Sequence, residues 1–266
     1  MWRVLVEGRE EVGPVPGARR LLAGREDVAG VGGFLTDIEQ FDGRFFRLSP
    51  AEATAMDPRQ RLFLEVAYEA LEQAGYGGGR LSGQRCGVFV GAGSQDYQAG
   101  SGGGKGGVYW ATGASPSILA SRLAYFLDLH GPCLPVDTAC SSSLVALHLA
   151  CDSLRNSQCD TALVGGVHLN LWLANFAAFE QMGALSASGH CRAFDASADG
   201  FVPAEGCVAV LLKPLEAAID AGDTIHAVIR STATNNDGRT NGLTAPNPAA
   251  QRDVILEAWS AGKIDP

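Results

Sequence analysis

One cysteine followed by three serines is the part of this sequence that points most directly to chemistry. Residues 136–144 are V-D-T-A-C-S-S-S-L, so Cys140 stands between an apolar run and the start of a helical pattern. This layout predicts a strand over 133–137, a sharp turn, and a helix from Ser141 onward with apolar positions Leu144, Leu147, Leu149, Cys151 and Leu154.

A helix that begins directly after a cysteine changes the chemistry of the thiol. Its free N–H groups and positive dipole end favour the thiolate of Cys140 over the thiol. The small neighbours leave room for an acyl group beside those N–H groups. A cysteine among small residues is more often an inert core residue. The strand-to-helix junction favours a nucleophile here.

Several blocks of the chain, in order, resemble a β-ketoacyl synthase, and more narrowly the ketosynthase domain of a modular type I polyketide synthase. The strongest are D-T-A-C-S-S-S at 137–143 and T-G-A-S-P-S-I-L-A-S-R-L-A-Y-F at 112–126. The others are G-G-F-L at 32–35, F-D-G-R-F-F at 41–46, M-D-P-R-Q-R-L at 56–62, C-R-A-F-D-A-S-A-D-G-F at 191–201 and G-L-T-A-P-N at 242–247.

This resemblance implies an acyltransferase of polyketide or fatty acid biosynthesis. Ketosynthases move an acyl chain from a carrier protein's phosphopantetheine thiol onto their cysteine, then join it by decarboxylative Claisen condensation to a malonyl-type extender. Cys140 is the one residue that inherits a catalytic role by direct match, and no residue is assigned to a cofactor or a metal. The chain itself is expected to bind no cofactor, because its substrates arrive on an acyl carrier protein. The family also implies a homodimer, with the strand before Cys140 near its two-fold axis.

The histidines of this chain do not match those that the family uses. The family carries two histidines and a lysine on H-G-T-G-T and K-S-N-I-G-H motifs, and neither motif occurs here. His148 lies eight residues beyond Cys140, roughly 12 Å along the predicted helix, which is out of reach of the thiol. The other four match no catalytic block: His130, His168 beyond a V-G-G turn, His190 and His226. We expect a downstream segment or a separate chain to carry the catalytic histidines and a second oxyanion-hole donor.

The two ends of the chain predict an incomplete domain. Asn247 and Pro248 are typical of an N-cap and first helical residue, and the apolar pattern then runs to Ala261 before Gly262. In an alternating α/β chain the next strand should follow. Met1 already stands in an apparent first helix. We therefore expect a short N-terminal loss and a long C-terminal loss, with residues 1–222 forming the N-terminal half and 223–266 the incomplete beginning of the C-terminal half.

Strands alternate with helices along the chain. A helix capped by Asp57 and Pro58 presents Phe63, Val66, Ala67, Ala70, Leu71 and Ala74 on one face and ends at Gly75. Strands are predicted over 85–92, 160–164, 207–213 and 224–234, and helices from Ser115, over 175–182 and from Pro214. The fold class is α/β. The resemblance sharpens this to a thiolase-like layered fold, the N-terminal half plus the start of the C-terminal half.

Composition excludes several classes of protein. The 266 residues are 46% hydrophobic and 18% charged, which is typical of a globular α/β chain. A net charge of −9 without a basic stripe argues against nucleic acid. Seven cysteines without C-x-x-C argue against a disulfide framework and a zinc site. No apolar stretch suits a membrane span and no signal peptide begins the chain, so the predicted location is cytoplasmic.

Two further patterns suggest chemistry less strongly. Residues 100–107 contain G-x-G-x-x-G, but no strand leads into them and the P-loop residues are not matched, which favours a flexible loop. Asp195, Asp199 and Glu205 suggest a carboxylate pair or a metal site. The family carries acidic residues at matching places, which favours a structural role.

Four residues depart from the family pattern. Pro203 and Ala204 stand within G-F-V-P-A-E-G, where relatives tend to have arginine and glycine, and Ala114 and Ser121 stand where asparagines are frequent. Proline removes a backbone donor, and alanine tolerates a positive φ poorly. These departures support an alternative function, a non-catalytic ketosynthase remnant that serves dimerisation or carrier-protein docking. A cysteine hydrolase is a third and weaker hypothesis, because no histidine and acid pair accompanies the cysteine.

Overall fold

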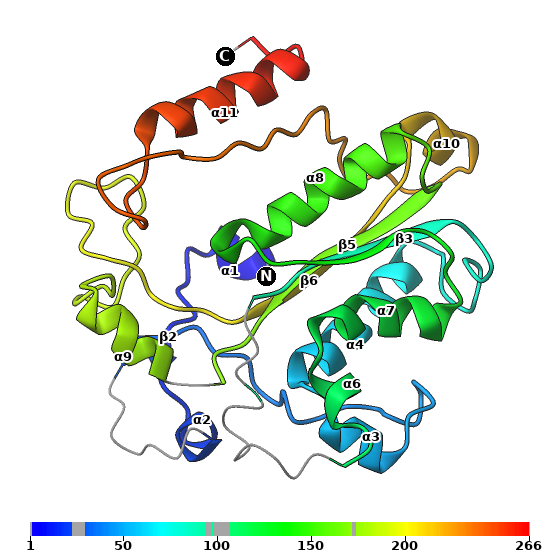
Figure 1. The fold of residues 1–266 in the computed structure, drawn as a ribbon, viewed down its shortest axis with the longest axis horizontal. Coiled ribbons are helices and arrows are strands. Elements are labelled where there is room, and N and C mark those ends of the chain that lie inside the picture. The colour runs from blue at the N-terminus through cyan, green and yellow to red at the C-terminus, as the bar shows by residue number, and fades with distance from the viewer. Residues whose placement is uncertain (1, 23–29, 94–96, 98–106, 172–173, 266) are drawn as a thin grey trace.

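A four-stranded sheet forms the centre of the chain (Figure 1). The computed structural model describes residues 2–22, 30–93, 97, 107–171 and 174–265. The strand order is β4–β3–β5–β6, comprising β3 (Cys86–Gly91), β4 (Cys133–Val136), β5 (Thr161–His168) and β6 (Gly206–Leu212). β3 pairs in parallel with β4 and β5, whereas β6 runs antiparallel to β5. All six residues of β3 are buried, as expected for a central parallel strand.

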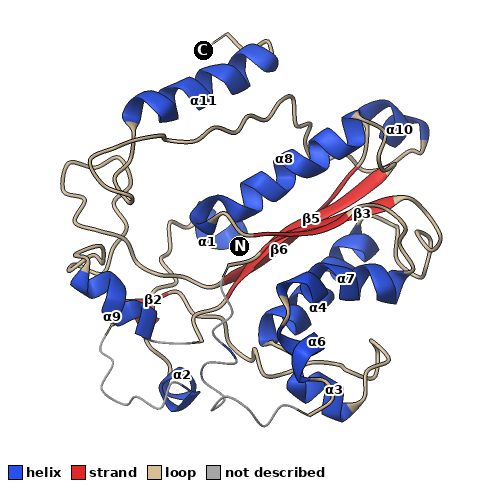
Figure 2. Ribbon diagram, in the orientation of Figure 1, coloured by secondary structure: helices blue, strands red, loops and turns tan. Residues whose placement is uncertain are grey.

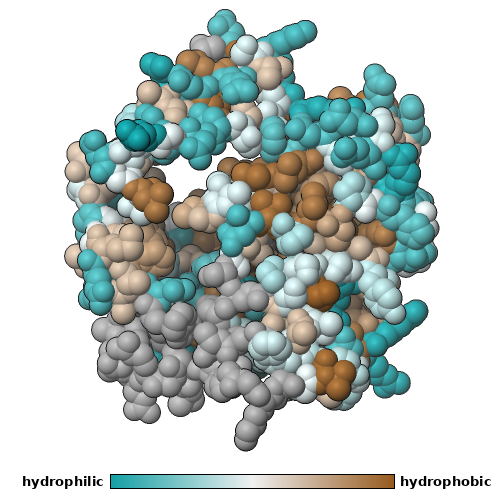
Figure 3. Space-filling view, in the orientation of Figure 1, coloured by the Kyte–Doolittle hydropathy of each residue, from teal (hydrophilic) through white to brown (hydrophobic). Residues whose placement is uncertain are grey.

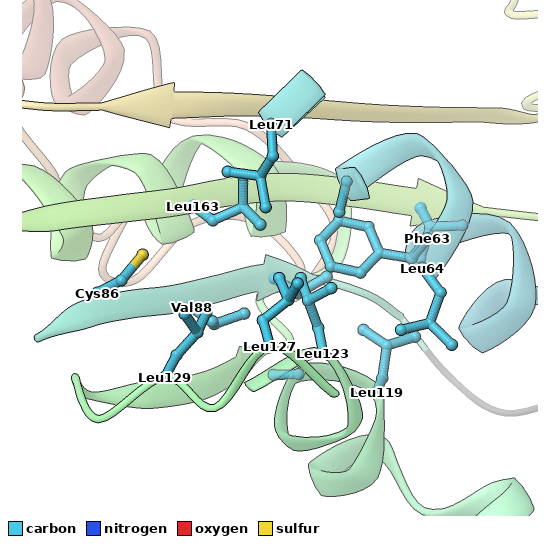
Figure 4. Close-up of a cluster of buried hydrophobic side chains, with 14 of the residues drawn as sticks. Phe63, Leu64, Leu71, Cys86, Val88, Leu119, Leu123, Leu127, Leu129 and Leu163 are labelled. Atoms are coloured by element: carbon cyan, nitrogen blue, oxygen red, sulfur yellow. The ribbon is translucent and has the colours of Figure 1, made fainter. Parts of the chain in front are cut away.

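Helices cover both faces of this sheet (Figure 2). α8 (Ser142–Arg155) packs on one face, and α4 (Pro58–Gln73) and α7 (Pro116–Leu127) pack on the other. Alternate side chains of a strand point to opposite faces. Val88 and Val90 accordingly join the core under α4 and α7 shown in Figure 4, whereas Phe89 joins the core under α8.

The local signals around α4 explain its limits. The Asp57 side chain accepts a hydrogen bond from the N–H of Arg59, and Pro58 occupies the first turn. After the helix, Gly75 takes a φ of 78°, a conformation that favours glycine. The predicted helix is confirmed, and its buried apolar positions are Phe63, Leu64, Ala67 and Leu71.

The remaining elements surround this core. The N-terminal part holds α1 (Trp2–Val6), β1 (Gly13–Pro14), α2 (Gly17–Leu22), β2 (Val31–Gly32) and α3 (Pro50–Ala55), and β1 pairs antiparallel with β2. Later come α6 (Trp110–Ala114), α9 (Ala174–Gln181), α10 (Leu215–Asp220) and α11 (Pro248–Ala261). Among the described residues, no helix is both long and apolar enough to cross a membrane.

The strand predicted over 224–234 was wrong. These residues run outside α8 as coil, and α11 lies beyond them (Figure 1). A strand needs a neighbour for its backbone N–H and C=O groups, and no described strand lies beside this segment. Side chains attach it instead. Ser231 Oγ donates to the carbonyl of Ala258 at 2.6 Å, and Thr232 Oγ1 lies 2.8 Å from His148 Nδ1.

Candidate active site

Cys140 lies at the junction of β4 and α8. The strand ends at Val136, residues Ala139–Ser141 form a 3-10 turn (η1), and α8 begins at Ser142. The predicted strand, turn and helix are therefore present, with α8 beginning one residue later than predicted. The Cys140 side chain is exposed, so its sulfur is open to a substrate.

The hydroxyl of Ser142 holds the turn in place. It accepts a hydrogen bond from the Thr138 N–H at 2.9 Å and donates one to the Ala139 carbonyl at 2.7 Å. Ser142 itself is only 6% exposed. The Asp137 carboxylate accepts the Ala139 N–H at 3.1 Å, and Ser141 Oγ donates to the Thr138 carbonyl at 2.9 Å. These bonds fix the backbone on the N-terminal side of Cys140.

The turn is strained immediately before the cysteine. Ala139 has a φ of 53°, in the left-handed region that costs a non-glycine residue roughly 1–2 kcal/mol. Strain of this kind persists where the surrounding structure fixes it, and it clusters at functional sites. The two hydrogen bonds of Ser142 span this residue. A strained strand-to-helix turn is the geometry that exposes the nucleophile in other enzymes.

Two glycines of the sheet let the N-terminus of α8 approach closely. Gly91 at the end of β3 is paired with Gly166 in β5. A Cβ on Gly91 would lie 2.5 Å from the backbone N of Ser143, and one on Gly166 would lie 2.9 Å from its Cβ. This role was not predicted from the sequence, although glycine within a strand is a known sign of close backbone approach. The expected turn at residues 165–166 was also wrong, because β5 continues through both glycines to His168.

The backbone beside Cys140 offers a hydrogen-bond donor. Within the described ranges, the Cys140 N–H donates to no backbone or side-chain acceptor. A free N–H at the start of a helix can stabilise an oxyanion on a thioester carbon attached to this sulfur. The turn thus combines a nucleophile with one oxyanion donor.

The histidines take other partners. His148 contacts Thr232 and Asp152, and the remaining contacts are His130 with Asp128, His168 with Asn170 and His190 with Glu10. Across the described residues, no histidine forms a hydrogen bond with Cys140. The part of the chain in view thus supplies Cys140 with no imidazole.

Most other cysteines are protected from reaction by burial. Desolvation raises the pKa of Cys133 to about 11 and that of Cys207 to about 12. It also raises the pKa of Cys86 and Cys151. Cys191 is the other exposed cysteine, and its Sγ accepts the Val202 N–H at 3.0 Å.

The acidic residues singled out in the sequence have structural contacts. The Glu205 side chain is fully buried and binds Arg19, with 3.1 Å between Oε2 and Nη2, and it accepts the N–H groups of Leu35 and Asn170. Asp199 accepts hydrogen bonds from Ser186 and Ser188, and the Ser186 bond is the main cause that lowers its pKa to about 2. Asp195 caps Ser197. No group of three possible metal ligands occurs in the described ranges.

The departures from the family pattern fit into the structure without strain. The Pro203 carbonyl accepts the Gly33 N–H at 2.9 Å, and Ala204 bridges to Gly33. Ala204 is not among the residues with positive φ. Ala114 is buried and Ser121 Oγ bonds to the carbonyl of Ser117. Most of the glycine-rich stretch at 100–107 lies outside the described residues.

Comparison with known proteins gives one consistent result. Residues 1–218 match the family model for the N-terminal domain of beta-ketoacyl synthase, and residues 226–266 match the one for its C-terminal domain. The whole chain is 50% identical to 15% of a phenolphthiocerol/phthiocerol polyketide synthase chain of Mycobacterium tuberculosis. It is 43% identical to 6% of the polyketide synthase PksM of Bacillus subtilis. The chain thus spans a small fraction of the curated relatives.

Solved structures agree with this. A ketosynthase from module 6 of the bacillaene synthase of Bacillus subtilis superposes with a TM-score of 0.90 at 41% identity, covering 99% of this chain and 45% of that one. The oxazolomycin ketosynthase domain of Streptomyces albus gives the same TM-score and identity, covering 100% of this chain and 49% of its own. With Cys140 in a strained turn between β4 and α8, the chain belongs to the beta-ketoacyl synthase family and has the thiolase-like fold of polyketide synthase ketosynthase domains.

Proposed function

We propose that this chain carries the acyl-binding part of a ketosynthase, with Cys140 as the residue that forms the acyl thioester. The single observation that supports this most is the exposed Cys140 thiol, set at the start of α8 beside a free backbone N–H. We further propose that residues 1–222 form the N-terminal half of the domain and 223–266 the beginning of the C-terminal half.

The first chemical step is a thioester exchange. The Cys140 thiolate attacks the carbonyl of an acyl group held on the phosphopantetheine of a carrier protein, and the Cys140 N–H stabilises the oxyanion. The carbon–sulfur bond to phosphopantetheine then breaks, and the carrier thiol leaves with a proton. In the condensation, a malonyl-type thioester loses carbon dioxide, its enolate carbon attacks the acyl carbonyl, and the Cys140 thiolate leaves.

The exchange is tested by intact mass spectrometry after incubation with an acyl thioester. We expect one acyl mass shift that Cys140→Ser abolishes. The matched control is Cys191→Ser, which removes the other exposed cysteine and should leave the shift unchanged. An acyl group that stays on the Cys140→Ser chain would contradict the proposal.

The condensation places a heavier demand on the site. Decarboxylation develops negative charge that positioned donors must stabilise, and the described histidines are engaged elsewhere. We therefore expect the 266-residue chain alone to yield acyl-Cys140 but no β-keto product and no released carbon dioxide when malonyl-carrier is added. Malonyl-dependent product from the purified chain would show that these donors are dispensable.

A second candidate function is a non-catalytic remnant that keeps a dimerisation or carrier-docking surface. The strained Ala139 and the Ser142 hydrogen bonds favour the catalytic proposal, because a turn kept only as scaffold gains nothing from an exposed thiol. The acylation experiment separates the two functions, because a remnant binds without acylation.

A further inference from the structure

A cavity lined by arginines lies between the loop before α3 and the first turns of α4. None of its lining residues belongs to the turn that holds Cys140. Its volume is about 610 Å³, within the range of small-molecule sites. Arg44, Arg47 and Arg61 line it together with Glu39, and Phe41 and Leu48 contribute apolar surface.

The charges of this lining do not balance. Three arginines against one glutamate leave a net charge of +2, although the whole chain carries −9. The neighbouring carboxylates are engaged elsewhere. Glu52 pairs with Arg122 at 2.6 Å, and Glu65 accepts the Asp42 N–H at 3.3 Å. Within the described ranges, no salt bridge neutralises the three arginines.

Arg61 is held in the wall of the cavity with an unused donor. Its Nη1 donates to the Glu39 carbonyl at 3.2 Å, while its Nε is buried and has no hydrogen-bond partner among the described residues. A buried charged donor without a partner costs stability. The structure therefore keeps here a donor that a bound anion would satisfy.

Arg47 adds a second local cost. Its φ is 57°, in the left-handed region that a non-glycine residue adopts reluctantly. Retaining an arginine there, instead of glycine or asparagine, places a guanidinium at the cavity despite the strain. Backbone strain of this kind clusters at ligand-binding positions.

We propose that this cavity binds a phosphomonoester with an apolar body. The two negative charges of a phosphomonoester match the +2 lining, and arginine forks fit phosphate oxygens in pairs. Phe41 and Leu48 would contact the apolar body. This inference goes beyond the proposed function and does not depend on the reactivity of Cys140.

The test is isothermal titration calorimetry of the full 266-residue chain with phenyl phosphate. We expect Arg44→Gln, Arg47→Asn and Arg61→Gln each to weaken binding about tenfold or more. Asparagine tolerates the left-handed backbone of Arg47, so that variant removes charge without adding strain. Arg239→Gln, an exposed arginine outside the lining, is the matched control and should bind like the parent chain.

Methyl phenyl phosphate, a diester with one charge, distinguishes the kind of phosphate. It should bind about tenfold or more weakly than phenyl phosphate. Tighter binding of the diester would overturn the proposal in favour of a phosphodiester such as the one that links phosphopantetheine to a carrier. No binding to the parent chain, or equal binding by the parent and all cavity variants, would also overturn it. If Arg61→Gln lowers the unfolding midpoint, the two exposed positions still decide the outcome.

Discussion

Exposure separates Cys140 from the other cysteines at the scale of single residues. Alkylation requires the thiolate, and burial raises the pKa of Cys133 to about 11, so about one molecule in ten thousand carries that thiolate at pH 7. Cys140 lies exposed at the start of a helix, where the dipole favours negative charge. Reactivity should therefore follow position in the fold.

Iodoacetamide labelling at neutral pH should modify Cys140 first and Cys191 second. Cys191 is exposed but lies in a loop without a helix N-terminus behind it. Cys133 should react only as the pH rises toward its raised pKa of about 11, because its thiol must first lose a proton. Peptide mapping by mass spectrometry gives the order. Finding Cys140 among the slowest residues would remove the argument that the turn activates it.

At the scale of elements, the seat of α8 depends on two glycines. Gly91 and Gly166 face each other in β3 and β5, and Ser143 lies directly over them. The small side chains of Ala146 and Ala150, both fully buried, continue this close approach along α8. The sheet and the helix therefore set the position of Cys140 together.

Gly91→Ala should destabilise the chain by about 1–3 kcal/mol, because the added methyl group would meet the backbone of α8. Labelling of Cys140 should also slow, since the clash displaces the turn. Gly93→Ala is the matched control. A Cβ there meets nothing within 4 Å and should change the free energy of unfolding by less than about 0.5 kcal/mol. Urea unfolding measures both, and equal effects would show that the close approach does not hold α8.

At the scale of the whole molecule, much apolar surface is uncovered. Hydrophobic side chains gather over α8 in Figure 3, and Leu144 is 70% exposed. β4 is an edge strand of the sheet, with Leu134 43% exposed. An uncovered edge strand next to an apolar helix invites pairing with another chain.

Self-association through this edge is the expected behaviour. Size-exclusion chromatography with light scattering should give a dimer or larger species, and Leu134→Lys should shift it toward monomer, because lysine on an edge strand opposes pairing. Leu243→Lys is the control, since Leu243 is fully exposed in a loop away from the sheet. A stable monomer of the parent chain would contradict this prediction.

Local signals were enough to predict most elements. The helix from Pro58 and the strands around Cys86 and Cys133 were recognised because caps, prolines and apolar runs lie within a few residues of the elements they define. The same holds for Cys140, whose neighbours announce a strand, a turn and a helix. Family resemblance added the reaction, which spacing alone does not specify.

Other features depend on residues far apart in the chain, and only the tertiary structure decided them. The segment 224–234 has a strand pattern but no strand beside it among the described residues, so its backbone stays unpaired in a sheet. The glycines under Ser143 and the arginines around the cavity come together only when distant segments pack. Sequence patterns report local preference, whereas close approach, burial and unbalanced charge are properties of which segments become neighbours.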